Sequence, residues 1–458
     1  MLTTAVRPFA PPLARTRVLL GLSLSYFAVL LDTTVLAVAE PDLARSLGSS
    51  TAGLQWVVTA YTVAFGAVLL SAGTLADRFG ADRLFRLGVA GFGAASAACA
   101  LAPGLWSLVV WRAVLGVAAA LSVPSGMALL GVVFPVPAER ARAVSVWAGV
   151  SGAAMACGPV VGGALVGWFG WRSVFWLNVP LTLLVLALTA SRGLRAPRRA
   201  QRTDWWSQAA LVAGLALLID ALIAAGAGEA GQAAVAGAGA LVAGGWFVRR
   251  ERDGELRRVV LAADGVRTAL AAGAAVNFAL LGVLFVLPLV FVRVWGWSAA
   301  VAGAAFLPMT VSPAGVPLLL TGRLVARRGP WLPVVAGAAL LAAGCAGAAA
   351  AVGFGASYPV LAMALGAVGF GVALSLPALV AAVVSSAPAG ATGAASGLLN
   401  AVRQVGASLG VAVLGALVAV PDRTGAATAL LLPVPVCAVA AVLALGRARR
   451  TSSRHQAS

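Results

Sequence analysis

The sequence contains no lysine and has little charge of any kind. Only 10% of its 458 residues are charged and 61% are hydrophobic, with a mean hydropathy of +0.99; soluble proteins average about 25% charged residues. This composition excludes a water-soluble enzyme. The net charge of +18 comes from arginines that interrupt long apolar runs, so a nucleic-acid partner is not expected either. We predict an all-α protein that spans a lipid bilayer many times.

Imidazole, paired thiols and a nucleotide motif are also missing. The single histidine, His455, lies in a polar tail, and the four cysteines stand inside apolar runs without CxxC spacing, so neither a metal nor another cofactor is predicted. Without lysine there is no G-x-x-x-x-G-K-[ST] motif for ATP. Energy for any transport would therefore come from an ion gradient, and carboxylates are the groups left to carry protons.

Fourteen apolar runs are close to the roughly 20 residues that a spanning helix needs. They lie near 18–38, 54–75, 84–103, 106–128, 141–166, 173–191, 206–225, 232–248, 267–292, 299–320, 332–352, 357–384, 393–419 and 424–446. Arginines precede the first run, but no small-residue cleavage site follows it, so we interpret it as a retained helix rather than a signal peptide.

The arginines predict the orientation of these helices. With both chain ends in the cytoplasm, most arginines fall in inner loops, as the positive-inside rule requires. Those left outside are Arg45, Arg172, Arg293 and Arg423. The prediction is a multi-pass protein of a bacterial cytoplasmic membrane.

Two sequence frames recur at almost the same offset. The frame G-x-L-x-x-R-x-G begins at Gly73 and again at Gly322, 249 residues later, and LSxP places Ser122 and Ser375 253 residues apart. Chance recurrence in an apolar background is the alternative. Duplication predicts two pseudo-symmetric six-helix halves, 1–192 and 259–458, with an inserted helix pair at 193–258.

Four ionisable side chains lie well inside predicted helices, where each costs at least ~2.5 kcal/mol and indicates function. Asp32 and Arg112 both lie six residues from an outer helix end, roughly 9 Å deep at 1.5 Å per residue. They can pair, and a carboxylate that gains or loses a cationic partner changes its proton affinity. We predict proton coupling at this pair; a static buried ion pair is the alternative.

The other two are Asp220 and Arg403. Asp220 is a second candidate for proton coupling, although it is close enough to its helix end to sit in the headgroup zone. Arg403 lies near the midplane, where it must face a cavity or a carboxylate. We predict a substrate cavity that includes Asp32, Arg403, Asn400 and Gln404.

Two groups of small residues predict moving parts. The run 141–166 carries Gly149, Gly152, Gly158, Pro159, Gly162 and Gly163. Small residues four apart permit close helix contact and Pro159 bends the axis, so gating and simple tight packing both fit. In the loop after the second run, Gly73, Asp77, Arg78 and Gly80 form either a latch at the inner gate or a solvated turn.

Together these motifs resemble the major facilitator superfamily, specifically its fourteen-helix drug:proton antiporters of the EmrB/QacA type. Asp32 with Thr34 and Pro41 resembles the motif of the first helix. The other matching segments are Leu54–Tyr61, Gly73–Gly80 (motif A), Arg112 with Gly116 (motif B), Gly158–Gly163 (the antiporter motif C), Trp171–Pro180 and Asn400–Gly406. The chain departs from the family pattern at Glu40, Leu115 and Ala81-Asp82.

The resemblance implies alternating access, with Asp32 and Arg112 in proton coupling. We expect a secondary transporter that exports a lipophilic small molecule, such as an antibiotic, drug or toxic metabolite, in exchange for protons. Export of an amino acid, siderophore or other metabolite is the first alternative, and a proton-coupled symporter the second. An enzyme would need a nucleophile or metal cluster at membrane depth, which the sequence does not offer.

Overall fold

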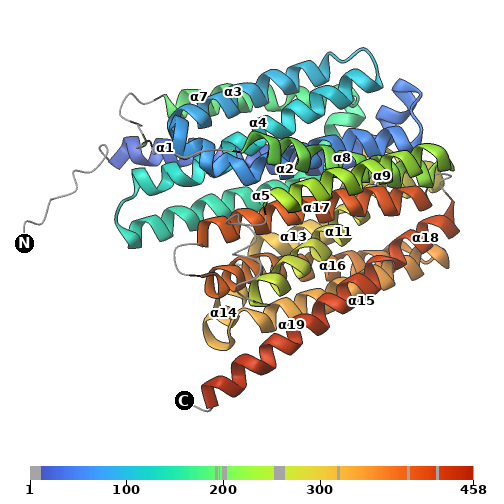
Figure 1. The fold of residues 1–458 in the computed structure, drawn as a ribbon. Coiled ribbons are helices and arrows are strands. Elements are labelled where there is room, and N and C mark those ends of the chain that lie inside the picture. The colour runs from blue at the N-terminus through green and yellow to red at the C-terminus, as the bar shows by residue number, and fades with distance from the viewer. Residues whose placement is uncertain are drawn as a thin grey trace, which may run out of the picture.

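The computed structural model is a bundle of long helices lying side by side (Figure 1). It describes residues 12–456 except 191–193, 195, 197, 199–203, 252–263, 317–319, 389–391 and 419–421. Within this part of the chain every regular element is a helix. Eleven of the described helices are long and apolar enough to cross a membrane.

The first bundle, α1 to α7, begins with two long buried helices. Its members are α1 (Pro12–Leu47), α2 (Thr51–Phe79), α3 (Ala81–Ala100), α4 (Leu105–Val133), α5 (Pro137–Phe169), α6 (Arg172–Trp176) and α7 (Asn178–Thr189). Helix α1 packs along α5 and α7, while α4 packs along α2 and α3. Gly48 and Gly80 take positive φ values of 59° and 95° in the turns that end α1 and α2, a conformation that glycine adopts at little cost.

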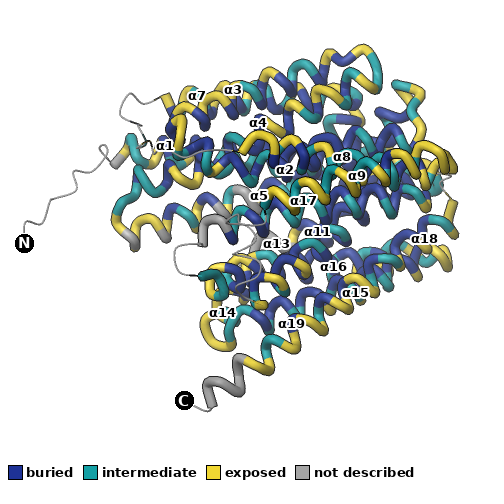
Figure 2. Tube along the Cα trace, in the orientation of Figure 1, coloured by how far each residue is buried: buried dark blue, intermediate teal, exposed yellow. Residues whose placement is uncertain are grey.

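Helices α8 (Trp205–Gly226) and α9 (Ala230–Arg250) form a separate hairpin. Asp204 caps α8 by accepting the N–H groups of Trp206 and Ser207. Helix α8 packs against both α2 and α17, whereas α9 packs mainly on α8. Of the candidate spans, α8 and α9 are the least buried, and exposed and intermediate residues follow both helices in Figure 2. Much of the apolar surface of α9 is exposed, as expected for helices that face lipid.

The second bundle runs from α11 to α19. Its members are α11 (Asp264–Leu289), the π-helical turn η1 (Val290–Val294), α12 (Ala299–Ala304), α13 (Leu307–Val316), α14 (Gly322–Arg328), α15 (Trp331–Gly353), α16 (Tyr358–Ser386), α17 (Thr392–Leu417), α18 (Arg423–Leu431) and α19 (Pro433–Gln456). Helix α11 packs along α17 and α15 along α16. The bundles meet where α2 contacts α17 and α5 contacts α12 and α13.

The prediction of an all-helical fold is confirmed, but the count of fourteen spanning helices is not. Helix α3 begins with Asp82, Arg83 and Arg86, which lower its apolarity, so it is not among the eleven. Helix α5 contains the whole predicted run 141–166. The predicted run 299–320 is divided into α12 and α13, and neither helix alone is long enough to cross a membrane.

Prolines explain further breaks within the predicted runs. Run 173–191 is divided into α6 and α7, and run 424–446 into α18 and α19. Pro180, Pro308 and Pro433 each stand in the first turn of the following helix. Proline is tolerated there because the first-turn N–H groups have no intrahelical partner.

The two repeated sequence frames occupy matching places in the two bundles. Gly80 ends α2 and Gly329 ends α14, both with positive φ. Gly88 of α3 lies so close to α4 that an added Cβ would come 2.7 Å from the N atom of Ser122. A Cβ added to Gly337 of α15 would likewise come 3.0 Å from the N atom of Ser375 in α16. Each LSxP serine thus marks a tight helix contact.

The bundle has two ends, named here by the turns that form them. At the Gly80 end α1 begins, α2 turns into α3 and α19 finishes; at the Gly48 end α1 turns into α2 and α5 into α6. In Figure 1 the Gly80 end is on the left and the Gly48 end on the right.

Candidate functional site

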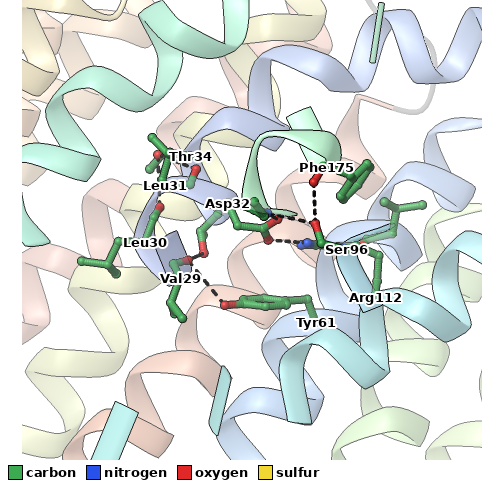
Figure 3. Close-up of polar contacts among 12 residues, drawn as sticks. Val29, Leu30, Leu31, Asp32, Thr34, Tyr61, Ser96, Arg112 and Phe175 are labelled. Atoms are coloured by element: carbon green, nitrogen blue, oxygen red, sulfur yellow. Dashed lines mark hydrogen bonds and ion pairs between the residues drawn. The ribbon is translucent and has the colours of Figure 1, made fainter. Parts of the chain in front are cut away.

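Asp32 and Arg112 meet inside the first bundle as a buried ion pair (Figure 3). Nη1 of Arg112 donates to Oδ2 of Asp32 at 2.5 Å, and the two side chains are only 1% and 2% exposed. Asp32 comes from the middle of α1 and Arg112 from the second turn of α4. The sequence prediction that these residues can pair agrees with this geometry.

Asn178 holds the second oxygen of the carboxylate. Its Nδ2 donates to Oδ1 of Asp32 at 2.9 Å and lies 3.1 Å from Oγ of Ser96, which itself donates to the carbonyl of Phe175. The site therefore joins α1, α3, α4, α6 and α7. In the sequence Asn178 stands only as part of the family motif Trp171–Pro180; its position in the first turn of α7, flanked by apolar residues, is the signal that could have identified it.

The guanidinium of Arg112 also contacts a carbonyl and aromatic rings. Its Nε donates to the carbonyl of Val57 at 3.0 Å, and its Cζ lies 4.5 Å from the centre of the Tyr61 ring. Because Arg112 is enclosed by carboxylate, carbonyl and aromatic ring, its buried charge is compensated.

A small pocket lies on the other side of α1, between the bundles. Its lining includes Thr34 and Pro159 from the first bundle and Met309, Thr310 and Gly369 from the second. Thr34 stands two residues after Asp32, which on a helix turns its side chain about 200° away. Asp32 itself does not line this pocket, and α1 separates the ion pair from it.

The glycines of α5 pack against helices of both bundles. A Cβ on Gly158 would collide with the side chain of Thr34, and one on Gly162 would lie 2.9 Å from the carbonyl oxygen of Val35. Gly163 faces the second bundle, where a Cβ would lie 2.6 Å from the carbonyl oxygen of Ala299 in α12.

The remaining predicted residues of α5 differ from these three. Pro159 lies within the uninterrupted helix, with its carbonyl against Gly303 of α12. Gly149 has open space where a Cβ would stand, and the surroundings of Gly152 lie outside the described part of the structure. Close packing is thus concentrated in Gly158–Gly163, at the Gly48 end.

Arg403 and Asn400 form a polar cluster in α17. Nε of Arg403 donates to Oδ1 of Asn277 at 3.3 Å, and its Nη1 donates to Oδ1 of Asn400 at 3.0 Å. Among the described residues no carboxylate forms an ion pair with Arg403. Gln404 instead packs against Gly66 of α2. Asn277, which lies on α11, was not among the residues predicted from the sequence.

Asp220 is not part of the Asp32 site. Its Oδ1 accepts a hydrogen bond from Nε2 of Gln232 at 2.9 Å, within the α8–α9 hairpin. The structure thus separates the two acidic candidates that the sequence grouped together, and gives Asp220 a neutral partner on its neighbouring helix.

The Gly73–Gly80 segment ends α2 and turns the chain into α3. Asp77 is half-buried and Arg78 is exposed beside the Phe79 ring; neither forms an ion pair within the described part of the chain. Gly73 is exposed with free space around it. Asp82, which the sequence showed only as a departure from the family pattern, accepts the backbone N–H of Ala196 at 3.2 Å. This carboxylate ties the turn to the segment after α7.

The expectation that only four ionisable side chains lie well inside the helices was wrong. Glu40 of α1 is 2% exposed, and its Oε2 has no hydrogen-bond partner in the described structure. The sequence places Glu40 beside Pro41 and Asp42, near a helix end, which concealed its burial.

Comparison with known proteins identifies a family match over most of the chain. The sequence model of the Major Facilitator Superfamily matches residues 22–411. The Tetracenomycin C resistance and export protein of Streptomyces glaucescens is 36% identical over 419 residues, covering 88% of this chain and 75% of that protein. The Multidrug resistance protein Stp of Mycobacterium tuberculosis is 32% identical over 415 residues, with the same coverage. The Puromycin resistance protein pur8 of Streptomyces alboniger is 34% identical over 416 residues, covering 88% and 80%.

Solved structures share the fold. A peptide transporter POT in complex with sulfate has a TM-score of 0.70 at 18% identity and covers 96% of this chain and 95% of that one. The human organic anion transporter MFSD10 (TETRAN) has a TM-score of 0.64 at 17% identity, covering 95% and 100%. At these identities the likeness concerns the fold alone.

Proposed function

The chain belongs to the Major Facilitator Superfamily, and from this premise we propose that it exports a lipophilic small molecule in exchange for protons. The family and the relatives named above are transporters and not enzymes, and those relatives are resistance and export proteins. The protein is therefore a membrane transporter. What we propose is its coupling ion, its substrate class and its direction of transport.

The observation that carries the proposal is the buried Asp32–Arg112 pair with Asn178 on its second oxygen. A carboxylate held by a cation at membrane depth can take one proton, and that proton weakens its attraction to Arg112. Because Thr34 lines the pocket on the opposite face of the same helix, movement of α1 after protonation would reach the pocket. This is a physical route from proton binding to substrate release.

The pocket and the Arg403 cluster support the substrate class. Apart from Thr34 and Thr310, the pocket is lined by apolar side chains and glycine, and methionines such as Met155 and Met309 adapt to varied shapes. Arg403, Asn400 and Asn277 offer donors and acceptors in the second bundle. We propose a lipophilic substrate with few polar groups, neutral or of low charge, because the described residues of this lining include no carboxylate that would bind a strongly cationic one.

The close contacts of α5 support alternating access. Gly158 and Gly162 pack on α1, and Gly163 packs on α12 across the boundary between the bundles. We propose that the Gly48 end opens when α5 and α12 separate, and that the segment Gly73–Gly80 with Asp77 and Arg78 serves the gate at the other end. Asp220 is retained as a secondary candidate for proton coupling.

The proposal includes the finer topology predicted from the sequence. It comprises fourteen spans of the EmrB/QacA type, with two six-helix halves (1–192 and 259–458) and the hairpin region 193–258 between them. In the proposal both termini face the cytoplasm of a bacterial cell. Export of an amino acid, siderophore or other metabolite, and a proton-coupled symporter, are the alternatives.

Transport into inverted membrane vesicles tests the function. Vesicles from a pump-deficient bacterial host are loaded with acid inside, and uptake of a lipophilic fluorescent dye is followed. Antiport predicts uptake that requires the pH gradient and is lost in Asp32→Asn, with Glu229→Gln in the exposed α8–α9 turn as the matched control. Uptake that needs the opposite gradient would indicate symport. If no compound of a chemically diverse panel moves, the export proposal is wrong.

A further inference from the structure

Glu40 is a buried acid that the proposed mechanism does not use. It lies on α1, eight residues or about 12 Å beyond Asp32 toward the Gly48 end. The residue is 2% exposed and its Oε2 is buried without a hydrogen-bond partner among the described residues. Asp32, on the same helix, has partners for both oxygens. The two carboxylates therefore differ: both oxygens of Asp32 are paired, whereas Oε2 of Glu40 is buried and unpaired among the described residues.

An ionised carboxylate is strongly disfavoured where it is buried without hydrogen bonds, so such a group takes up a proton or moves to water. No salt bridge joins Glu40 to another described residue. The charges that act on Glu40 come from Arg112 on α4 and Arg293 on η1. Other charged groups near this stretch are Asp32, Asp42 and Arg45 of α1 and Arg172 of α6, whose guanidinium donates to the carbonyl of Ala102.

The position of Glu40 connects its burial with closure of one end. Helix α1 contacts α11 and α12 of the second bundle, and Gly163 of α5 touches Ala299 and Gly303 of α12. Of the two cations that act on Glu40, Arg112 belongs to the first bundle and Arg293 to the second. When the bundles separate at the Gly48 end, water reaches this region and Glu40 can ionise.

We propose that Glu40 is a second proton-binding site, which must be protonated before the Gly48 end can close. The inference rests on the proposed alternating access and adds a residue to it. A proton taken up at Glu40 from the side to which the Gly48 end opens would permit closure, and loss of that proton would favour the open form. Asp32 and Glu40 would then bind protons in different conformations of one cycle.

The test measures opening of the Gly48 end and needs no substrate. Spin labels are attached at Ser49→Cys and Val301→Cys, one on each bundle, in a Cys157→Ser background, since the other three cysteines are buried. Their separation is measured by double electron–electron resonance in lipid nanodiscs from pH 5.5 to 9. The same titration is made with Glu40→Gln, which keeps the size but stays neutral, and with Glu229→Gln as the control.

If the proposal is right, the population with the longer label-to-label distance grows as pH rises in the native protein and in Glu229→Gln. For a single titrating group, the ratio of open to closed molecules changes by at most roughly tenfold per pH unit. Glu40→Gln should stay closed throughout. Identical titrations for Glu40→Gln and the native protein, or no opening of the native protein at any pH, would overturn it. Thermal unfolding in detergent checks that Glu40→Gln folds, and Glu40→Met is the second neutral variant.

The spin-label experiment can succeed or fail independently of the dye-transport experiment that tests the proposed function. Dye transport can fail while the distance still responds to Glu40, in which case the proton site stands and the export proposal falls. Conversely, antiport that depends on Asp32 with a distance indifferent to Glu40 leaves one proton site, and the inference is withdrawn.

Discussion

The two bundles share a helical scaffold but differ in the charged side chains that they bury and in the partners of those side chains. In the first, Asp32 and Arg112 neutralise each other away from water. In the second, the residue 253 positions after Arg112, at the offset that relates Ser122 to Ser375, is the fully buried Leu365. Arg403, a cation of that bundle, has only amide hydrogen-bond partners among the described residues.

This difference indicates that the two bundles have different roles. Close contacts between glycine and serine, as at Gly88–Ser122 and Gly337–Ser375, are kept in both bundles because they set the distance between helices. Ionisable groups carry a large cost in a membrane, so they persist where they have a use. In the proposed function, the first bundle would exchange the proton and Arg403 of the second bundle would contact the substrate.

Removing one member of the ion pair should have the largest effect on stability. Arg112→Gln leaves Asp32 buried with Asn178 alone, and breaking a buried pair from one side costs about 3–5 kcal/mol. The double variant Asp32→Asn with Arg112→Gln should cost less than the sum of the single changes, by roughly 0.5–3 kcal/mol. Melting temperatures of all four proteins in detergent measure this. Strict additivity would mean that the two side chains do not interact.

A change at the contact between bundles should come next. Gly163→Ala places a methyl group 2.6 Å from the carbonyl oxygen of Ala299, so α5 and α12 must separate and closure of the Gly48 end is impaired. We expect a several-fold loss of dye transport. Gly245→Ala in α9, where nothing lies near the added methyl group, is the matched control. Equal activity in both variants would show that the α5–α12 contact is not part of the cycle.

A smaller and more selective effect is expected at Arg403. Arg403→Gln removes the cation, so the KM for substrates that bear an acidic or strongly accepting group should rise while neutral dyes are little affected. Arg403→Lys keeps the charge and should recover part of the loss. KM values for dyes of different charge in vesicles provide the measurement. A uniform fall in the maximal rate for every dye would indicate a structural role instead.

The exposed pair Asp204–Arg250 should have the smallest effect. The hydrogen bond from Arg250 lowers the pKa of Asp204, so this carboxylate adds stability at neutral pH that is lost as pH falls through its lowered pKa. Solvent screens such pairs, and they contribute little. Asp204→Asn should leave transport unchanged and shift the melting temperature slightly at pH 7 and even less at pH 4. A fall as large as that of Arg112→Gln would remove the contrast between buried and exposed pairs.

The sequence was sufficient to predict the helical membrane fold and the Asp32–Arg112 pair. Both depend on local features, namely the length of apolar runs and the depth of a charge within them. Gly158, Gly162 and Gly163 were also identified from spacing, but that they face two different helices depends on the packing of α5 against α1 and α12.

The sequence did not reveal Asn178, Asn277 or the burial of Glu40. Amide side chains are common on helices, and only tertiary packing shows which of them meets a charge. Glu40 stands near the end of its helix, where an acid is normally solvated, and it is buried because other helices cover that turn of α1. Asp220 is the opposite case. Its depth within the helix suggested proton coupling, but its hydrogen-bond partner is the neutral side chain of Gln232.

Proton movement coupled to substrate tests the central claim most directly. Purified protein is reconstituted in liposomes with a pH-sensitive dye inside, and a transported compound from the panel is added outside without an imposed gradient. The native protein should move protons in the direction opposite to the compound, and Asp32→Asn should move none while still exchanging labelled for unlabelled compound. Proton movement of native size in Asp32→Asn would contradict the assignment of coupling to the first bundle.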